Sequence, residues 1–273
     1  MKENVEAHSF ADTKVVIISG GKGTRLSSLL DQVPKPMIQI GEKPLLEHLV
    51  LHSIRCGFTQ FLLKVGYLSE KIQNYFEDGK AFNCKIEYYV EKELLGTCGG
   101  LNFLQYEKKP VIVIYGDTLI NINLLKLLEY HNKKKAQATL VVHESDHPED
   151  SDIIITDNNN QVINLIHKPG TDQFGNISNA ALYVLNPECF SEIPQNGVWD
   201  FAKNLIPRLI KQQYKIFAYP TEEYIKDIGT VKRYKEVQED LRQGKVFNRV
   251  QAVFLDRDGV INYERGLLKK KKS

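Results

Sequence analysis

The chain has 273 residues, of which 42% are apolar and 26% are charged, and its 36 basic and 34 acidic residues give a formal net charge of +2. This composition is typical of a globular protein with one large α/β domain or two smaller ones. A charge so close to zero argues against nucleic acid or a membrane surface as the partner. The sequence has neither an apolar run of the ~20 residues that span a membrane nor an apolar signal segment at its N-terminus. We therefore expect a cytoplasmic protein.

In the first half of the chain, short apolar runs alternate with helical patterns. The runs at residues 15–18, 61–65 and 111–115 predict strands, and residues 85–90 are predicted as a further strand. A helix is predicted over residues 44–55, with Gly57 as its stop, and a second helix begins near Ser69 as its N-cap. A glycine-rich turn after residue 95 is expected to open a third helix. This alternation predicts a mostly parallel sheet with helices on both faces.

Beyond residue 138 strands and helices no longer alternate regularly. Strands are predicted at residues 138–143, 152–156, 162–166, 180–185 and 215–219. Helical segments are predicted at residues 187–193, 200–212 and 230–242. Residues 243–245 are interpreted as a linker.

A glycine-rich loop follows the first predicted strand, at residues 19–26. It is not a dinucleotide fingerprint, because Leu26 stands where the third glycine should be, and it lacks the spacing of a P-loop. A plain tight turn would not explain Arg25 in the loop or the Pro34-Lys35-Pro36 segment soon after it. Glycines let backbone N–H groups approach phosphate oxygens, and Arg25 and Lys35 add positive charge. The sequence therefore predicts a polyphosphate site.

The loop and the Pro34-Lys35-Pro36 segment resemble the G-G-x-G-T-R-L…P-K-P signature of the sugar-1-phosphate nucleotidyltransferase family. The resemblance implies an α/β, Rossmann-like three-layer fold with a mixed, mostly parallel central sheet. It implies that Arg25 and Lys35 stabilise the leaving pyrophosphate. The nucleotide-binding residues it implies are Ser19, Gly20, Gly21, Lys22, Gly23, Thr24, Arg25, Lys35, Gly96, Thr97 and Gly116.

Two aspartates are candidates for a metal site. Asp117 follows the strand predicted at residues 111–115, at the sheet edge where α/β proteins bind ligands. Asp227 lies in a segment, residues 224–230, that resembles the family's W-x-D-I-G-T-P. Each alone could be a turn or helix-start aspartate. Together they resemble the two metal carboxylates of the family, which implies Mg²⁺ on Asp117 and Asp227.

Three more segments resemble family motifs on the sugar side of the site. Residues 95–100 resemble the L-G-T-A-G loop, which lies against the nucleobase and the sugar. Residues 167–169 resemble E-K-P with histidine in place of glutamate, and residues 178–183 resemble N-A-G-x-Y with alanine in place of glycine. The implied sugar-binding residues are Gly99, Lys168, Asn179 and Tyr183. The implied catalytic residues are Arg25, Lys35, Asp117, Lys168 and Asp227.

Two further stretches indicate which sugar and which nucleotide the resemblance implies. Residues 147–152, HPEDSD, resemble a segment of D-glycero-α-D-manno-heptose-1-phosphate guanylyltransferases. Residues 254–262 resemble the opening of heptose-bisphosphate phosphatases of the haloacid-dehalogenase family, which act one step earlier in the same pathway. These resemblances imply GTP and a heptose 1-phosphate as substrates, with GDP-heptose for surface polysaccharide as the product. The alternatives are mannose-1-phosphate guanylyltransferase, glucose-1-phosphate cytidylyl- or thymidylyltransferase, and a non-catalytic regulatory subunit that binds nucleotide sugars.

We thus expect a polar leader at residues 1–13, a nucleotidyltransferase domain at 14–243, and a linker with an incomplete phosphatase start at 244–273. A phosphatase built on Asp256 as nucleophile and Asp258 as acid/base would need a core of about 100–200 residues. The few residues after Asp258 cannot supply that core, so we expect no phosphatase activity from this chain. No nucleic acid or membrane partner is expected, and a homo-oligomer is left open.

Overall fold

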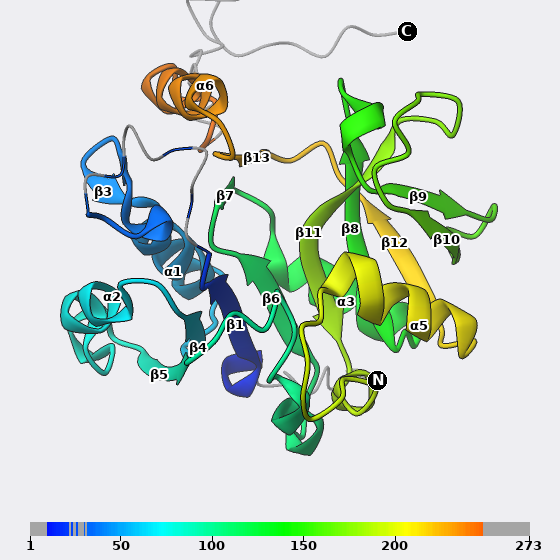
Figure 1. Ribbon diagram of the computed structural model, residues 1–273, viewed down its shortest axis with the longest axis horizontal. Helices are drawn as coiled ribbons and strands as arrows, with labels where there is room; N and C mark the ends of the chain where they lie inside the picture. Colours follow the sequence, from blue (N-terminus) through cyan, green and yellow to red (C-terminus); the bar gives the residue numbers. More distant parts are fainter. Residues whose placement is uncertain (1–9, 22, 24–25, 27–29, 31, 248–273) are drawn as a thin grey trace, which may run out of the picture.

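The computed structural model describes residues 10–21, 23, 26, 30 and 32–247 (Figure 1). The predicted phosphatase start at residues 254–262, like Lys22, Thr24 and Arg25 of the glycine loop, lies outside the described residues. None of the helices in the described ranges is both long and apolar enough to cross a membrane.

The described part is an α/β fold around one large mixed sheet. Its strands are β1 (Lys14–Ser19), β2 (Gln39–Ile40), β3 (Lys43–Pro44), β4 (Gln60–Val65), β5 (Lys85–Val90), β6 (Val111–Tyr115), β7 (Thr118–Ile120), β8 (Ala138–Glu144), β9 (Ile153–Thr156), β10 (Val162–Ile166), β11 (Ile177–Leu185), β12 (Ile216–Pro220) and β13 (Ile225–Asp227). Its α-helices are α1 (Leu45–Arg55), α2 (Ser69–Phe76), α3 (Leu124–Lys134), α4 (Pro187–Phe190), α5 (Ile206–Lys211) and α6 (Val231–Arg242).

The half of the sheet nearest the N-terminus is parallel. Strand β1 pairs in parallel with β4 on one side and β6 on the other, and β4 pairs in parallel with β5. The apolar runs of β1 and β6 suit this position, because strands in a parallel sheet are covered on both faces. The register places Ile18 beside Tyr115, so the loops that follow β1 and β6 leave the sheet next to each other.

The other half of the sheet is mixed. Strand β11 lies antiparallel between β6 and β8, and β12 pairs in parallel with β8. The hairpin of β9 and β10 joins β11 through the single pairing of Ser178 with Ile153. The predicted α/β fold with a mixed central sheet is therefore confirmed.

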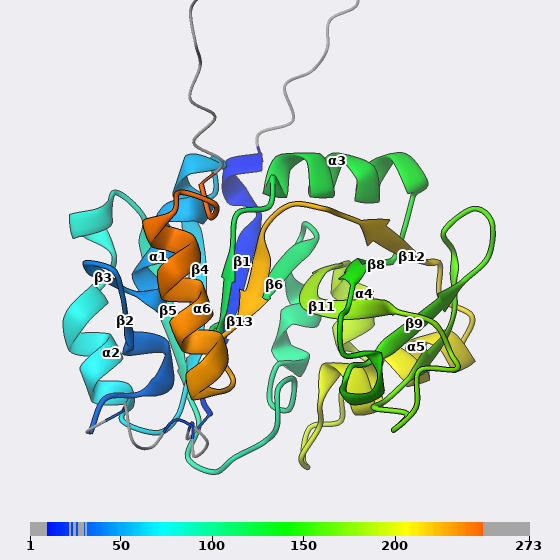
Figure 2. The same cartoon turned by 90° about the horizontal axis from the view of Figure 1, so that it is seen from above.

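Both faces of the sheet are covered by helices, as predicted (Figure 2). Successive residues of a strand point to opposite faces, so Val16 packs in one core while Val15 and Ile17 pack in the other. The Val15 side contains residues of α1, α2 and α3, and the Val16 side contains residues of α4 and α5. Each fully buried aliphatic side chain contributes about 1.5–3 kcal/mol of burial energy, so these two cores hold the sheet rigid under the loops at its edge.

A third core joins the two ends of the described chain. Leu26 of the glycine loop and Leu30 after it pack with Val237 of α6 and with Val246 beyond it. Helix α6 begins at Val231, one residue after the predicted start, because Thr230 is its N-cap and its side chain accepts a hydrogen bond from the Arg233 N–H at 3.2 Å. The last helix of the described chain therefore packs against the first loop.

Some predicted elements differ from the structure. The N-cap of α2 is Leu68, in the left-handed region, and Ser69 is the first helical residue without a capping hydrogen bond. The helix expected after the 95–100 turn is only a 3-10 turn, Asn102–Tyr106. The helix predicted over 200–212 opens with a π-helical turn, Phe201–Leu205, before α5. These differences concern ends and short turns, where local propensity decides least.

Candidate active site

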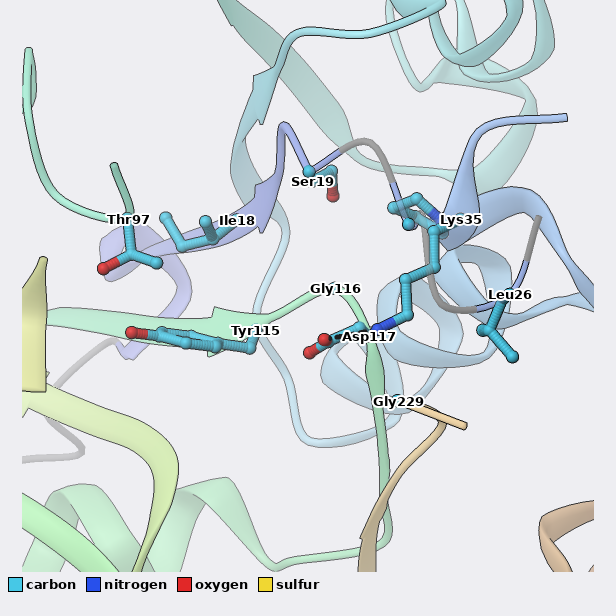
Figure 3. Close-up of a pocket in the computed structure, with 12 residues that line it drawn as sticks. Ile18, Ser19, Leu26, Lys35, Thr97, Tyr115, Gly116, Asp117 and Gly229 are labelled. Carbon is cyan, nitrogen blue, oxygen red and sulfur yellow. Dashed lines mark hydrogen bonds and ion pairs between the residues drawn. The ribbon is translucent and has the colours of Figure 1, made fainter. Parts of the chain in front are cut away.

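A cleft of about 270 Å³ opens at the carboxyl ends of β1 and β6 (Figure 3). The two strand ends are joined there, because the Gly116 N–H donates to the Ile18 carbonyl at 2.9 Å. This is the edge of an α/β sheet at which ligands bind. The cleft is lined by Ile18, Ser19, Gly21, Gly23, Leu26, Lys35, Pro36, Thr97, Tyr115, Gly116, Asp117 and Gly229. It therefore gathers the glycine loop, Lys35, Thr97 and Asp117, which the sequence had placed in separate motifs.

Gly116 allows the two loops to approach this closely. A Cβ atom at Gly116 would lie 2.6 Å from Ser19 Oγ and 2.8 Å from the Ile18 carbonyl oxygen. Ser19 is 2% exposed as a residue, and within the described residues its buried hydroxyl oxygen has no hydrogen-bond partner. A buried polar atom without a partner is costly, so Ser19 offers an unused hydrogen bond beside the cleft.

Replacing Gly116 with alanine should lower the free energy of unfolding by about 1–3 kcal/mol, because the added methyl group meets a backbone oxygen that cannot turn away. Urea unfolding measures this change. Gly21→Ala is the matched control, since a Cβ at Gly21 meets no atom of the described residues within 4 Å and the free energy of unfolding should change by less than about 0.5 kcal/mol. Equal losses for the two variants would refute the steric argument.

Lys35 reaches the cleft from a turn stiffened by proline. The 3-10 turn Lys35–Met37 follows Pro34, whose φ is −65°, and its second residue, Pro36, is buried. Lys35 Nζ lies 2.7 Å from Asp117 Oδ2, and the two side chains are 13% and 37% exposed (Figure 3). The sequence predicted that Lys35 stabilises the pyrophosphate and that Asp117 holds the metal ion. In the structure the two side chains are in direct contact.

Asp227 is brought beside Asp117 by a small two-stranded sheet. Strand β13 pairs antiparallel with β7, with Asp227 opposite Thr118, and the Ile228 N–H donates to the Asp117 carbonyl at 2.9 Å. The Asp227 carboxylate accepts the Gly229 N–H at 2.7 Å, and its other oxygen lies 2.7 Å from Arg233 Nη1. Arg233 was missed by sequence reasoning, because an arginine in the first turn of a helix resembles an ordinary surface residue.

The two aspartates suit a magnesium ion by their chemistry. Magnesium prefers oxygen ligands and is usually held by one or two carboxylates together with substrate phosphates. Among the described residues no group of three or more acidic, histidine or cysteine side chains could hold a metal, so a closed site made only of protein ligands is not formed by them. The donors present are Asp227 at the end of β13 and Asp117 directly before its partner strand β7, and they fit an ion that shares its coordination with a phosphate.

The loop that contributes Thr97 is fixed by residues far away in the sequence. The Trp199 N–H donates to the Leu95 carbonyl at 2.8 Å, and the Trp199 carbonyl accepts the Cys98 N–H at 2.9 Å. Asp200 Oδ1 accepts the Thr97 N–H at 3.1 Å. Gly96 has a φ of +76°, and a Cβ there would lie 2.5 Å from the Trp199 carbonyl oxygen, so the position requires glycine. Trp199 and Asp200 are thus site-supporting residues that the sequence motifs did not indicate.

The residues predicted for the sugar do not line this cleft. Lys168 is exposed just after β10, with a φ of +41°. On β11, Asn179 Nδ2 donates to the Tyr183 hydroxyl at 2.7 Å, and Tyr183 is 0% exposed. Burial raises the pKa of Tyr183. The Tyr183 phenol is therefore a core group that contacts Asn179.

Residues 147–152, which suggested a heptose substrate, contact the segment around Lys168, the lysine predicted to bind the sugar phosphate. His167 Nδ1 lies 2.5 Å from Asp152 Oδ1, and the Gly170 N–H donates to the Glu149 carbonyl at 3.0 Å. The histidine that replaces the family's glutamate thus has an acidic partner in residues 147–152. This pair stands directly before Lys168 in the chain.

The sequence model of the nucleotidyl transferase family matches residues 14–244. The chain belongs to this family. It is 30% identical, over 81% of its length, to a UTP–glucose-1-phosphate uridylyltransferase of Synechocystis, and it spans 61% of that protein. It is 31% identical, over 84% of its length, to a D-glycero-alpha-D-manno-heptose 1-phosphate guanylyltransferase of Aneurinibacillus thermoaerophilus, of which it covers 98%.

Solved structures of nucleotidyl transferases have the same fold. The crystal structure of HddC from Yersinia pseudotuberculosis superimposes with a TM-score of 0.72 at 27% sequence identity, covering 84% of this chain and 99% of that one. The mixed sheet of this chain is therefore also the fold of that solved structure.

Proposed function

We propose that the protein transfers a nucleoside monophosphate from a nucleoside triphosphate to a sugar 1-phosphate, giving a nucleoside diphosphate sugar and pyrophosphate. The observation that carries this proposal is the cleft at the ends of β1 and β6, where the glycine loop, Lys35 and Asp117 meet. Family membership supports the same reaction. In this assignment the nucleotide contacts Ser19, Gly20, Gly21, Gly23, Lys35, Gly96, Thr97 and Gly116, together with Lys22, Thr24 and Arg25 outside the described residues.

The chemistry requires little from the protein beyond placement and charge. A sugar 1-phosphate is ionised at neutral pH, so one of its oxygens can attack the α-phosphorus without a general base. The new bond joins that oxygen to the α-phosphorus, and the bond to the β-phosphate oxygen breaks, releasing pyrophosphate. The protein must hold the two substrates in line and neutralise the developing charge. Lys35 supplies positive charge inside the cleft, and Arg25 is assigned the same role.

Asp117 and Asp227 are the residues that would hold magnesium. When bound, the ion would neutralise charge on the phosphates. Both carboxylates contact cations of this chain, since Asp117 lies against Lys35 and Asp227 against Arg233. The chain therefore keeps two cationic side chains at the metal position, and these can pair with phosphate oxygens once the carboxylates bind an ion.

The sugar phosphate is assigned to Lys168, and the sugar ring to Gly99 and Asn179. Since the Tyr183 ring is wholly buried, we assign Tyr183 to orienting the Asn179 amide rather than to touching the sugar. The pair of Asp152 and His167 braces the backbone that precedes Lys168. GTP and D-glycero-α-D-manno-heptose 1-phosphate are the proposed substrates. Residues 147–152 and the guanylyltransferase relative covered over 98% of its length support this choice.

A pyrophosphate-release panel tests the proposal. The four common nucleoside triphosphates are crossed with heptose, mannose and glucose 1-phosphates, with magnesium and with a chelator in its place. We expect release that depends on magnesium and is at least about tenfold faster with GTP and the heptose phosphate than with other pairs. Faster release with another pair would overturn the substrate assignment. No release with any pair would overturn the enzyme assignment and favour a regulatory, nucleotide-sugar-binding subunit.

A further inference from the structure

An ion pair is buried inside the parallel half of the sheet. Lys64 in β4 and Glu91 just after β5 approach to 2.5 Å between Nζ and Oε1, and their side chains are 0% and 3% exposed. Burial lowers the pKa of the Lys64 ammonium, and the Glu91 carboxylate opposes that shift. Removing two charges from water is expensive, and packed apolar residues of similar size are often as stable or more so. The neighbours of Lys64 in β4 are apolar, so an apolar residue would suit the strand.

The pair makes directed contacts with the loop that contributes Thr97. Lys64 Nζ donates to the Gly96 carbonyl at 2.8 Å, and Glu91 Oε1 accepts the Leu95 N–H at 3.1 Å. The two charged groups therefore bind two consecutive residues of this loop, one through its N–H and the other through its carbonyl. Apolar side chains could fill the same space but could not fix the loop in this way.

The same carboxylate lies against the glycine loop. A Cβ atom at Gly20 would lie 2.2 Å from Glu91 Oε2, so the Gly20 backbone rests directly on the Glu91 carboxylate. Gly20 belongs to the loop after β1, and Leu95 and Gly96 belong to the loop after β5. The ion pair thus contacts two of the segments that border the cleft, the loop after β5 through both of its side chains and the glycine loop through Glu91.

We propose that Lys64 and Glu91 are positioning residues, which hold the Leu95–Thr97 loop and the glycine loop at a fixed separation and thereby set the binding of the nucleoside part of the triphosphate. This inference rests on the proposed function. In this proposal Lys64 and Glu91 serve to position the substrate and not to stabilise the fold. An experiment can separate these two roles.

The double variant Lys64→Met/Glu91→Leu tests this assignment. It removes both charges together and leaves apolar side chains of similar length, so the fold is retained while the contacts to Leu95 and Gly96 are lost. We expect KM for the nucleoside triphosphate to rise at least about tenfold, with kcat and KM for the sugar 1-phosphate within about threefold of the wild type. The amides of residues 95–97 should exchange with solvent at least about tenfold faster.

Trp199 supplies a second readout that does not depend on turnover. It is the chain's one tryptophan, and its N–H donates to the Leu95 carbonyl at 2.8 Å. Titration of GTP followed by tryptophan fluorescence therefore reports nucleotide binding beside this loop. We expect weaker GTP binding in the double variant by the same factor as the rise in KM.

Lys85→Met is the matched control. Lys85 forms an ion pair with Glu87 within β5, and the two side chains are exposed, at 62% for Lys85 and 43% for Glu87. This variant should leave KM and amide exchange unchanged. Unchanged KM, GTP binding and exchange in a folded double variant would overturn the inference. If the double variant does not fold, Glu91→Asp keeps the charge but shortens the reach to Leu95, and the same rise in KM is expected. A wild-type protein that binds GTP without turnover would refute the proposed function alone, since binding and exchange still test the pair.

Discussion

Replacing Asp117 with asparagine should lower the rate of pyrophosphate release by about a thousandfold or more. The substitution keeps the size of the side chain but removes the negative charge that the proposed magnesium site requires. A bound metal ion supplies several kcal/mol of charge stabilisation in such reactions, and each 1.36 kcal/mol is worth a factor of ten in rate. Steady-state turnover over a range of magnesium concentrations measures the effect.

The fold should survive this change. The ion pair between Asp117 and Lys35 is partly exposed, and pairs of this kind contribute about 0–1 kcal/mol. Urea unfolding should therefore show a small change in stability. Binding of Mn²⁺, followed by its paramagnetic signal in the presence of GTP, gives a readout besides turnover and should weaken. Asp172→Asn, at an exposed position in another loop, is the control. Near-normal turnover and metal binding in Asp117→Asn would remove Asp117 from the site.

Replacing Glu91 alone with leucine should lower the free energy of unfolding by about 3–5 kcal/mol, because the Lys64 ammonium is left buried without its counter-charge. This loss is far larger than the change of less than about 0.5 kcal/mol that surface substitutions typically cause. Urea unfolding monitored by circular dichroism measures the loss.

The companion measurement is a double-mutant cycle. Adding Lys64→Met to Glu91→Leu removes the unpaired charge, so most of the lost stability should return. Lys64→Met alone should be destabilised as well, since it leaves the Glu91 carboxylate buried. A double variant as unstable as Glu91→Leu would contradict this account. In that case the cost would come from packing and not from charge.

The large strands could be predicted from the sequence because they are local patterns. Strands β5, β6 and β10 begin and end at the predicted residues. Strand β6 is a continuous apolar and aromatic run, while β5 and β10 are short segments rich in β-branched and aromatic residues, and such patterns mark strands in a layered α/β fold. The glycine loop and Asp117 also followed from local sequence, since they come directly after such strands.

The contacts that complete the site could not be predicted in this way. Strands β7 and β13 are three residues each, too short for a periodic signal, yet they place Asp227 beside Asp117. The contacts of Arg233 and Asp200 depend on chain segments that meet only in the folded protein. Lys64 did carry a signal, because a lysine within a run of apolar strand residues requires a buried partner. The sequence alone did not identify that partner as Glu91.

The third core, in which Leu26 and Leu30 pack with Val237 and Val246, has a consequence for how the protein is made. A ribosome synthesises the glycine loop more than two hundred residues before α6, the helix that packs on it. Strand β13, which carries Asp227, arrives just before that helix. Because domains fold as units once their contacts are available, a nascent chain that ends before β13 has the glycine loop without helix α6 and without Asp227. Nucleotide binding that requires both should therefore appear late in synthesis.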